Sequence, residues 1–374
     1  MSTARKIWST TWRAALGAFL LLWVFHLIFS REAAHYPGYE AAAWARLSWW
    51  DRTQTAWTHG PTHLWGTLTL VNPTALLLSF LLMGLTLLLG VVRWRMVLRV
   101  QGLLLPWGRA SEISLVAHFF NSFLLGSTGG DLMKAYYAAR ETHHRKPEAV
   151  VTVLVDRLIG LWAMLLFSAL MMLPNFPLLF AHDQLRTLSA LVLLMLVGTS
   201  GVLLIAFRRG LSRRWPGAHH WLRRLPKGDW LERSLESCRQ FGHEPFFLSR
   251  TLGVSMVLNA VCVLQLLVLS WGLHLNISPV ALFVIVPMII CVSAIPITPS
   301  GLGVRENLFV FMLAEPSLHV PASSALSLSL LAYAGSLCWS LVGGVVYAML
   351  KDRHHLREDE LGAREEGVQG VLDP

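Results

Sequence analysis

The most regular feature of the chain is a series of long apolar runs separated by short polar segments. A helix needs about 20 apolar residues to cross the hydrocarbon core of a bilayer. Six runs reach this length: 12–30, 72–91, 148–172, 187–207, 250–275 and 325–350. The first resembles a signal peptide, but no small-x-small cleavage site follows it, so we expect an uncleaved helix. The pattern predicts an all-α membrane protein with six spanning helices.

Two further apolar stretches are interrupted by glycine and proline. Residues 111–147 are broken at the segment GSTGGD, and residues 279–320 at PITPSGLG. Lipid cannot satisfy the backbone groups that such breaks release, so the breaks must be buried in protein or face a watery cavity. We therefore predict that each stretch forms a re-entrant hairpin of two broken helices.

The distribution of lysine and arginine predicts the orientation. Most of the 31 basic residues lie in five segments: 1–13, 92–110, 132–147, 208–250 and 351–374. The positive-inside rule places these segments, and both termini, in the cytoplasm of a bacterial inner membrane. The first hairpin then enters from the cytoplasmic face and the second from the outer face. The polar segment 351–374, of mixed charge, is expected to be a disordered tail.

This order of elements predicts one transmembrane domain, residues 1–350, built from two similar halves. The halves, about 12–172 and 187–350, each read as span, amphipathic elbow, span, broken hairpin and span. The elbows are expected at about 40–57 and 229–241. Because each half crosses the membrane three times, the second must be inverted. Inverted repeats with matched broken helices are typical of transporters, whose substrate sites lie near the bilayer midplane.

Composition narrows the function classes. Only 14% of residues are charged and 54% are hydrophobic, which argues against a large soluble domain. The net charge of +9 is explained by topology and by contacts to anionic lipid, so we expect no nucleic-acid partner. The four cysteines form no C-x-x-C pair, and nucleotide-binding and hydrolase motifs are absent from the sequence. We expect no metal, no cofactor and no catalytic residue.

The first break supplies five candidate substrate-binding residues: Asn121, Gly129, Gly130, Asp131 and Lys134. Glycines let backbone N–H groups approach an anion, and a helix that begins there adds the positive end of its dipole. Asp131 also fits a helix N-cap, with Lys134 one turn later. The alternative is that Asp131 only caps the helix and Lys134 only extends toward the membrane surface.

The second break supplies five more: Ser300, Gly301, Gly303, Arg305 and Glu306. Charged side chains are costly in lipid, so they are functional candidates by default. Arg305 can offer a planar fork of N–H donors to a phosphate. The alternative is a structural ion pair of Arg305 with Glu306 or with Asp131.

Asp156 and Arg157 complete the candidates, because they lie inside a predicted span. Adjacent helical residues point about 100° apart, so each needs another partner. We expect Arg157 to meet Asp131 or a lipid phosphate, and Asp156 to meet Lys134. The alternative is that the span begins later and both residues lie at the cytoplasmic interface.

Several segments in this order resemble the lysylphosphatidylglycerol synthase transmembrane-domain family, over about residues 10–350. They are RWRMVL from Arg93, NSFLLGSTGGDLMKAYY, VLVDRLIGL, PITPSGLGVRE and LSLLAYAGSLCWSLVGGVVY. The family more often has Pro-Gly where Gly126-Ser127-Thr128 stands, and often Glu at Asp156. Thr298 and Pro299 before the Ser-Gly are a further, slight departure. These differences remove no charge from the pattern.

The resemblance implies movement or handling of a lipid within the membrane. Bifunctional family members add a cytosolic aminoacyl-transferase domain, which we do not expect here because the chain ends soon after its last predicted span. Other relatives are associated with hopanoid lipids or polyprenyl-phosphate sugars. The leading hypothesis is a flippase or transporter for an anionic or polyprenyl-phosphate-linked lipid. The alternatives are a membrane-embedded enzyme acting on a lipid-linked phosphate or sugar, and a non-catalytic accessory subunit of an envelope-lipid pathway. A homo-oligomer and an envelope-pathway partner both fit the sequence.

Overall fold

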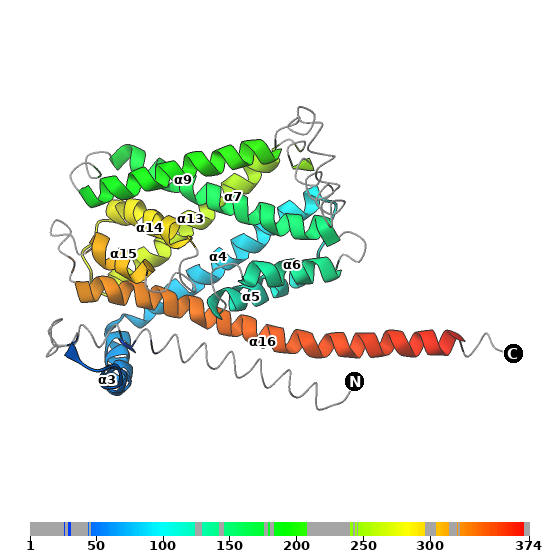
Figure 1. Ribbon diagram of the computed structural model, residues 1–374, viewed down its shortest axis with the longest axis horizontal. Helices are drawn as coiled ribbons and strands as arrows, with labels where there is room; N and C mark the ends of the chain where they lie inside the picture. The colour runs from blue at the N-terminus through cyan, green and yellow to red at the C-terminus, as the bar shows by residue number, and fades with distance from the viewer. Residues whose placement is uncertain are drawn as a thin grey trace.

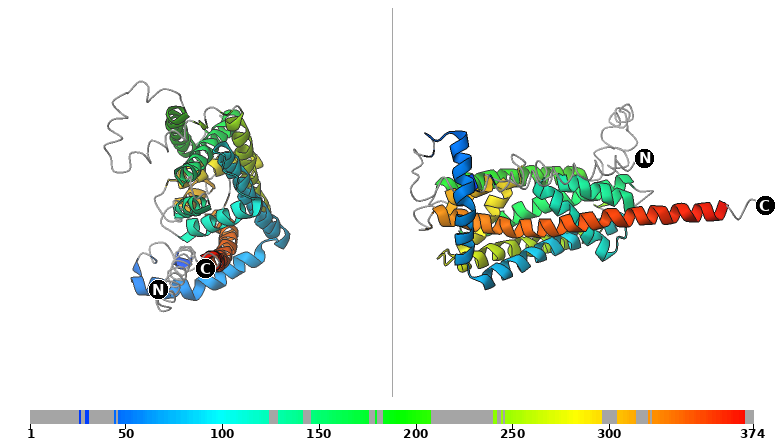
Figure 2. Two further views of the ribbon diagram at one scale, coloured as in Figure 1. Left: turned by 90° about the vertical axis from the view of Figure 1, so that its right-hand side faces the viewer. Right: turned by 90° about the horizontal axis from the view of Figure 1, so that it is seen from below.

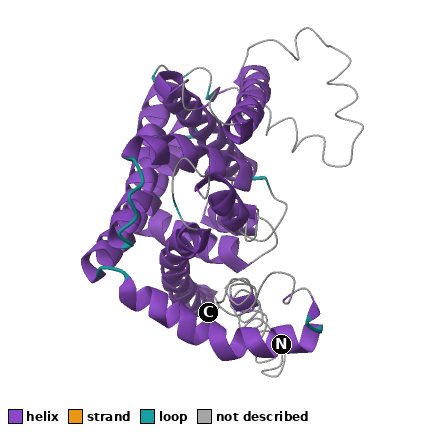
Figure 3. Ribbon diagram, turned by 90° about the vertical axis from the view of Figure 1, so that its left-hand side faces the viewer, coloured by secondary structure: helices purple, strands orange, loops and turns teal. Residues whose placement is uncertain are grey.

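The chain is helical throughout the parts that the computed structural model describes (Figure 3). These parts are residues 26, 29–30, 44, 46–123, 129–141, 146–175, 179, 183–207, 240–241, 244, 246–295, 304–313, 320 and 322–369. No strand occurs within them. The predicted all-α architecture is confirmed.

Five helices of the described segments are long and apolar enough to cross a membrane. They are α4 (Pro73–Val100), α7 (Lys146–Met172), α9 (Asp183–Phe207), α13 (Phe247–Gly272) and α16 (Ala322–Gln369). Each coincides with a predicted span, although α4 continues well beyond position 91. The predicted span 12–30 falls almost entirely outside the described residues, as does the second predicted elbow, 229–241.

The spanning helices form an elongated bundle (Figure 1). Helices α4 and α13 pack along their length, and the Asn72 backbone N–H donates to the Gly272 carbonyl at 3.1 Å. This bond joins the start of α4 to the end of α13, so the two helices are antiparallel. The largest apolar core surrounds α14 (Pro279–Ser293), which is apolar on all sides and therefore buried.

Each predicted hairpin contains two helices flanking the expected break. The first pair is α5 (Trp107–Phe123) and α6 (Gly129–Glu141), and the second is α14 and α15 (Val304–Leu313). The two helices of each pair contact each other. Entry of these pairs into a membrane from opposite faces stays a prediction.

The helix contacts are symmetric under exchange of the two halves. Replacing α4, α5, α6 and α7 by α13, α14, α15 and α16 reproduces the same neighbours. Thus α5 contacts α16 while α14 contacts α7, and α6 contacts α7 while α15 contacts α16. A twofold relation between the halves would produce this pattern.

The ends of α4 and α13 also match in detail. In both, a residue of positive φ follows the helix, Gly102 (φ 67°) and His274 (φ 55°). The next N–H then bonds back to the last turn, from Leu103 to the Leu98 carbonyl and from Leu275 to the Ser270 carbonyl. This is the Schellman arrangement, which satisfies carbonyls that a helix end leaves unpaired.

The N-terminal helix α3 (Trp49–Leu70) runs across α16 at one end of the bundle (Figure 2). It starts within the predicted elbow 40–57, and its Trp49 and Trp50 side chains are exposed. Ala56 packs in an apolar cluster with Leu326 and Leu330 of α16. The position of this helix at a membrane surface stays a prediction.

The C-terminal segment differs from the expected disordered tail. Helix α16 continues to Gln369 and projects past the bundle (Figure 1). Residues 351–369 contain no proline and consist largely of Arg, Glu, Leu and Ala, which favour helix. The spanning helix that precedes them also supplies a nucleus, so extension needs no new nucleation.

Close packing of α16 on α5 depends on glycine. A Cβ at Gly343 would collide with the Leu115 carbonyl, and a Cβ at Gly344 would lie 2.9 Å from Phe119 Cε2. We expect Gly343→Ala to lower the free energy of unfolding by about 1–3 kcal/mol through overpacking. Thermal unfolding in detergent measures this. Gly90→Ala is the matched control, because a Cβ there meets no atom within 4 Å. Equal losses in the two variants would contradict the packing explanation.

Candidate functional site

Three helices bring a buried carboxylate together with two cations. Asp156 of α7 accepts from Arg93 Nε of α4 at 2.8 Å on Oδ1, and from Lys134 Nζ of α6 at 3.1 Å on Oδ2. Asp156 is only 6% exposed and Lys134 only 9%. Each carboxylate oxygen thus holds one cation, which offsets the cost of burying the charges. These three residues are called the Asp156 cluster below.

Surrounding side chains hold the two cations in position. Arg93 Nη1 donates to the Ser255 hydroxyl of α13 at 3.3 Å, and the Lys134 ammonium lies 4.3 Å from the centroid of the Trp94 ring. A Cβ at Gly160 would lie 2.8 Å from Arg93 Nη1 and Nη2, so glycine leaves room for the guanidinium. The cluster therefore ties α4, α6, α7 and α13 together.

A second, looser pair lies next to the Asp156 cluster. Arg157 Nε is 3.5 Å from Asp131 Oδ2, and these side chains are 45% and 26% exposed. Asp131 also interacts electrostatically with Lys134 and Asp156. The pair is accessible while the Asp156 cluster is buried, so Arg157 is the cation that a ligand can reach with least rearrangement.

The helix break positions Asp131 at this point. The Gly130 backbone N–H donates to Asn121 Oδ1 at 2.8 Å, which links α6 to α5 across the break. A Cβ at Gly130 would collide with the Ala117 carbonyl, so only glycine allows this approach. Helix α6 begins at Gly129, which places Asp131 in its first turn. The predicted N-cap position of Asp131 is therefore wrong, although its carboxylate still favours the positive end of the helix dipole.

A third charged group lies between α15 and α16. Arg305 Nη2 donates to Glu306 Oε1 at 2.8 Å, and Glu306 is 1% exposed. The Ser329 hydroxyl donates to the same carboxylate oxygen at 3.5 Å. The Arg305 guanidinium lies 4.9 Å from the centroid of the Tyr333 ring, where a cation–π contact adds support.

The structure decides most of the alternatives that the sequence left open. The expected contacts of Asp156 with Lys134 and of Arg157 with Asp131 are both present. Arg305 pairs with Glu306, so this form of the structural ion pair is present. The candidates Ser300, Gly301 and Gly303 lie outside the described residues. Binding of substrate by any of these groups stays a prediction.

Sequence reasoning missed Arg93 and Ser255. The predicted span ended at 91, which made Arg93 one of the cytoplasmic basic residues, but α4 continues to Val100. Arg93 is then buried beside Asp156 with a side chain 14% exposed. A signal was available, because a carboxylate inside a span needs nearby cations and Arg93 opens a segment shared with the family that this chain resembles. Ser255 carries no such signal.

The charges of the three groups suit an anion. Four cations, Arg93, Lys134, Arg157 and Arg305, face three carboxylates, Asp131, Asp156 and Glu306. Within the described segments, no group of three His, Cys, Asp or Glu side chains is arranged to hold a metal ion. The chemistry on offer is therefore reversible binding of an anionic group by guanidinium and ammonium ions.

Comparison with known proteins agrees with this architecture. Residues 41–343 match the family described as "Lysylphosphatidylglycerol synthase TM region". The UPF0104 membrane protein MJ1595 of Methanocaldococcus jannaschii is 24% identical over 277 residues, which cover 70% of this chain and 80% of that protein. The family match spans all the spanning helices described above and the three charged groups. The chain therefore belongs to the lysylphosphatidylglycerol synthase transmembrane-region family.

Proposed function

We propose that this protein moves an anionic lipid between the leaflets of a bacterial inner membrane, with both of its termini in the cytoplasm. The observation that carries the proposal is Arg157, an arginine near the middle of the spanning helix α7 with a side chain 45% exposed. A charge at such depth is costly unless it faces a polar pathway or a ligand.

The lipid phosphate is proposed to replace Asp131 as the partner of Arg157. Their separation of 3.5 Å is longer than the 2.7–2.9 Å typical of charge-assisted hydrogen bonds, so this pair is weak. Lys134 lies one turn along α6 from Asp131 and supplies a second cation nearby. The Asp156 cluster fixes Lys134, and Arg305 with Glu306 serves the equivalent role in the second half.

The internal symmetry supports alternating access. The contacts exchange between the halves, the caps of α4 and α13 match, and a broken helix pair follows each cap. In inverted-repeat transporters one half moves against the other around a central site. We propose the same relation between residues 12–172 and 187–350, with Gly129 and Gly130 leaving space for the head group at the first break.

Transport can be measured in proteoliposomes containing fluorophore-labelled phosphatidylglycerol. Dithionite bleaches only outer-leaflet fluorophore, so the bleaching kinetics report movement of the lipid, with and without an imposed proton gradient. We expect wild type to accelerate movement and Arg157→Gln to slow it about tenfold, since about 1.5–3 kcal/mol is typical of a hydrogen bond to a charged group. Labelled phosphatidylcholine tests the requirement for net negative charge.

Arg250→Gln is the matched control, because Arg250 is an exposed arginine in the first turn of another spanning helix. It should move lipid like wild type. Failure of wild type to accelerate any anionic lipid, or equal rates for Arg157→Gln and wild type, would overturn the proposal. Mass spectrometry of the lipids after the assay distinguishes movement from chemical change, and a modified lipid would favour the enzyme alternative.

A further inference from the structure

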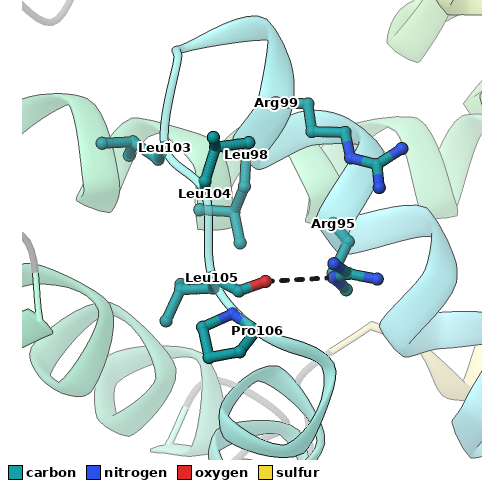
Figure 4. A pocket seen from close by; sticks show the side chains of 7 residues that line it. All are labelled: Arg95, Leu98, Arg99, Leu103, Leu104, Leu105 and Pro106. Carbon is teal, nitrogen blue, oxygen red and sulfur yellow. Dashed lines mark hydrogen bonds between the residues drawn. The ribbon is translucent and has the colours of Figure 1, made fainter.

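A cavity of about 310 Å³ lies at the end of α4, apart from the three charged groups described above (Figure 4). Its walls combine two cations with apolar side chains: Arg95, Leu98, Arg99, Leu103, Leu104, Leu105 and Pro106. None of the residues of the Asp156 cluster lines it. The transport mechanism proposed above gives this cavity no role.

The loop that closes the cavity is held rigidly. After α4, the Gly102 N–H bonds to the Arg99 carbonyl at 2.9 Å and the Leu103 N–H to the Leu98 carbonyl at 3.0 Å. Leu98 and Leu103 are both buried in one apolar cluster, the contact that accompanies a Schellman cap. The walls therefore do not need to be ordered by a ligand, which lowers the cost of binding.

Arg95 is prepared for an anion on one side of its guanidinium. Nε donates to the Leu105 carbonyl at 3.2 Å, and the group stacks 3.8 Å from the Trp107 ring centroid (Figure 4). Nη1 is buried and has no hydrogen-bond partner among the described residues. A buried donor without a partner costs about 1–3 kcal/mol, so an acceptor is expected in the cavity.

Arg99 adds a second positive charge one turn further along α4. It is exposed, and two like charges four residues apart on a helix repel each other. Within the described parts of the chain, neither Arg95 nor Arg99 forms an ion pair with a carboxylate. An anion between them would relieve the repulsion and satisfy Nη1.

The rim of the cavity is apolar and exposed. Leu104 is 83% exposed and Trp107 is 51% exposed, directly beside the two arginines. Helix α4 is apolar over most of its length and becomes basic only here, so the cavity lies where the span meets the membrane surface. Tryptophan is enriched at that level of a bilayer. A ligand at this point must pair a negative group with an apolar body.

We propose that this cavity binds the phosphate of an anionic membrane lipid in the leaflet that faces the end of α4. Arg95 receives the phosphate inside the cavity and Arg99 contacts it from the rim. Leu104 and Trp107 pack against the glycerol and the upper acyl chains. The site does not depend on transport, and it differs in position from the proposed pathway at Arg157.

Photo-crosslinking of the full-length protein tests the proposal. The probe is phosphatidylglycerol with a photoreactive head group, and labelled peptides are located by mass spectrometry. We expect label within residues 95–107, reduced about tenfold in Arg95→Gln/Arg99→Gln, as loss of charge-assisted hydrogen bonds predicts. Arg99→Gln alone should reduce it about threefold. Because Arg99 is exposed, this single variant keeps the test decisive even where the double variant folds poorly.

Three comparisons separate the explanations. Arg250→Gln, an exposed arginine at the same end of the bundle, should label like wild type. Arg157→Gln should also leave this label unchanged, so failure of the transport proposal is distinguishable from failure of this one. Unlabelled phosphatidylglycerol should compete, whereas phosphatidylcholine and millimolar inorganic phosphate should not. Competition by inorganic phosphate alone would indicate a soluble phosphate ligand and overturn the lipid assignment. Undiminished label in the arginine variants would overturn the site.

Discussion

Substitution of Asp156 by alanine is expected to lower the free energy of unfolding by about 3–5 kcal/mol. The change leaves Arg93 and Lys134 facing each other in a buried site without the carboxylate that holds both. Thermal unfolding in detergent and the yield of monodisperse protein would report this loss. Asp156→Asn keeps the shape but also removes the charge, so it should fall between alanine and wild type.

The control is to remove all three charges together. In Arg93→Met/Lys134→Met/Asp156→Leu the uncompensated cations are gone, and replacing buried ionic groups by apolar residues is often neutral or stabilising. The triple variant should therefore regain much of the stability that Asp156→Ala loses. Wild-type stability in Asp156→Ala would show that the cluster does not form as described. Recovered stability without lipid movement would assign these charges a role in transport as well as in folding.

Substitution of Arg305 by alanine is the second large effect. It leaves the Glu306 carboxylate, which is 1% exposed, with only the weak contact from Ser329 at 3.5 Å. Loss of one partner of a buried ion pair costs about 3–5 kcal/mol. We expect Arg305→Ala to unfold at markedly lower temperature than wild type, as measured in the same detergent.

Arg305→Ala/Glu306→Gln is the matched comparison. A neutral amide can hydrogen-bond to Ser329 and leaves no buried charge, so this double variant should be more stable than Arg305→Ala. If it is no better, the pair does not account for the loss. Because Arg305→Ala mixes folding with function, lipid binding in the second half is better compared between wild type and the double variant.

The coarse architecture follows from the sequence because lipid imposes simple rules. A span needs a fixed apolar length, so five described helices could be located from hydropathy. Glycine and proline cannot continue a helix in lipid without cost, so the two broken pairs could be located as well. The requirement that a charge inside a span find a partner also predicted two correct pairs, Lys134 with Asp156 and Arg157 with Asp131.

Helix ends were predicted less well. The apolar run of α4 becomes basic at Arg93, but the helix continues because its basic residues remain good helix formers and several are covered by neighbouring helices. Hydropathy measures residues in isolation, so it ended the span too early and placed Arg93 outside the site. The same reasoning took residues 351–369 for disorder, where the structure continues α16.

The sequence by itself determined the class of protein, the order of the spans, the two breaks and the family. These depend on local composition and on the bilayer as a solvent. Only the tertiary structure decided that Arg93 shares Asp156 with Lys134, that Glu306 is buried against Arg305, and that Arg95 and Arg99 border a cavity. Such contacts join residues far apart in the chain, or depend on which face of a helix is covered. Residue order does not encode these distances directly; they arise when the helices pack.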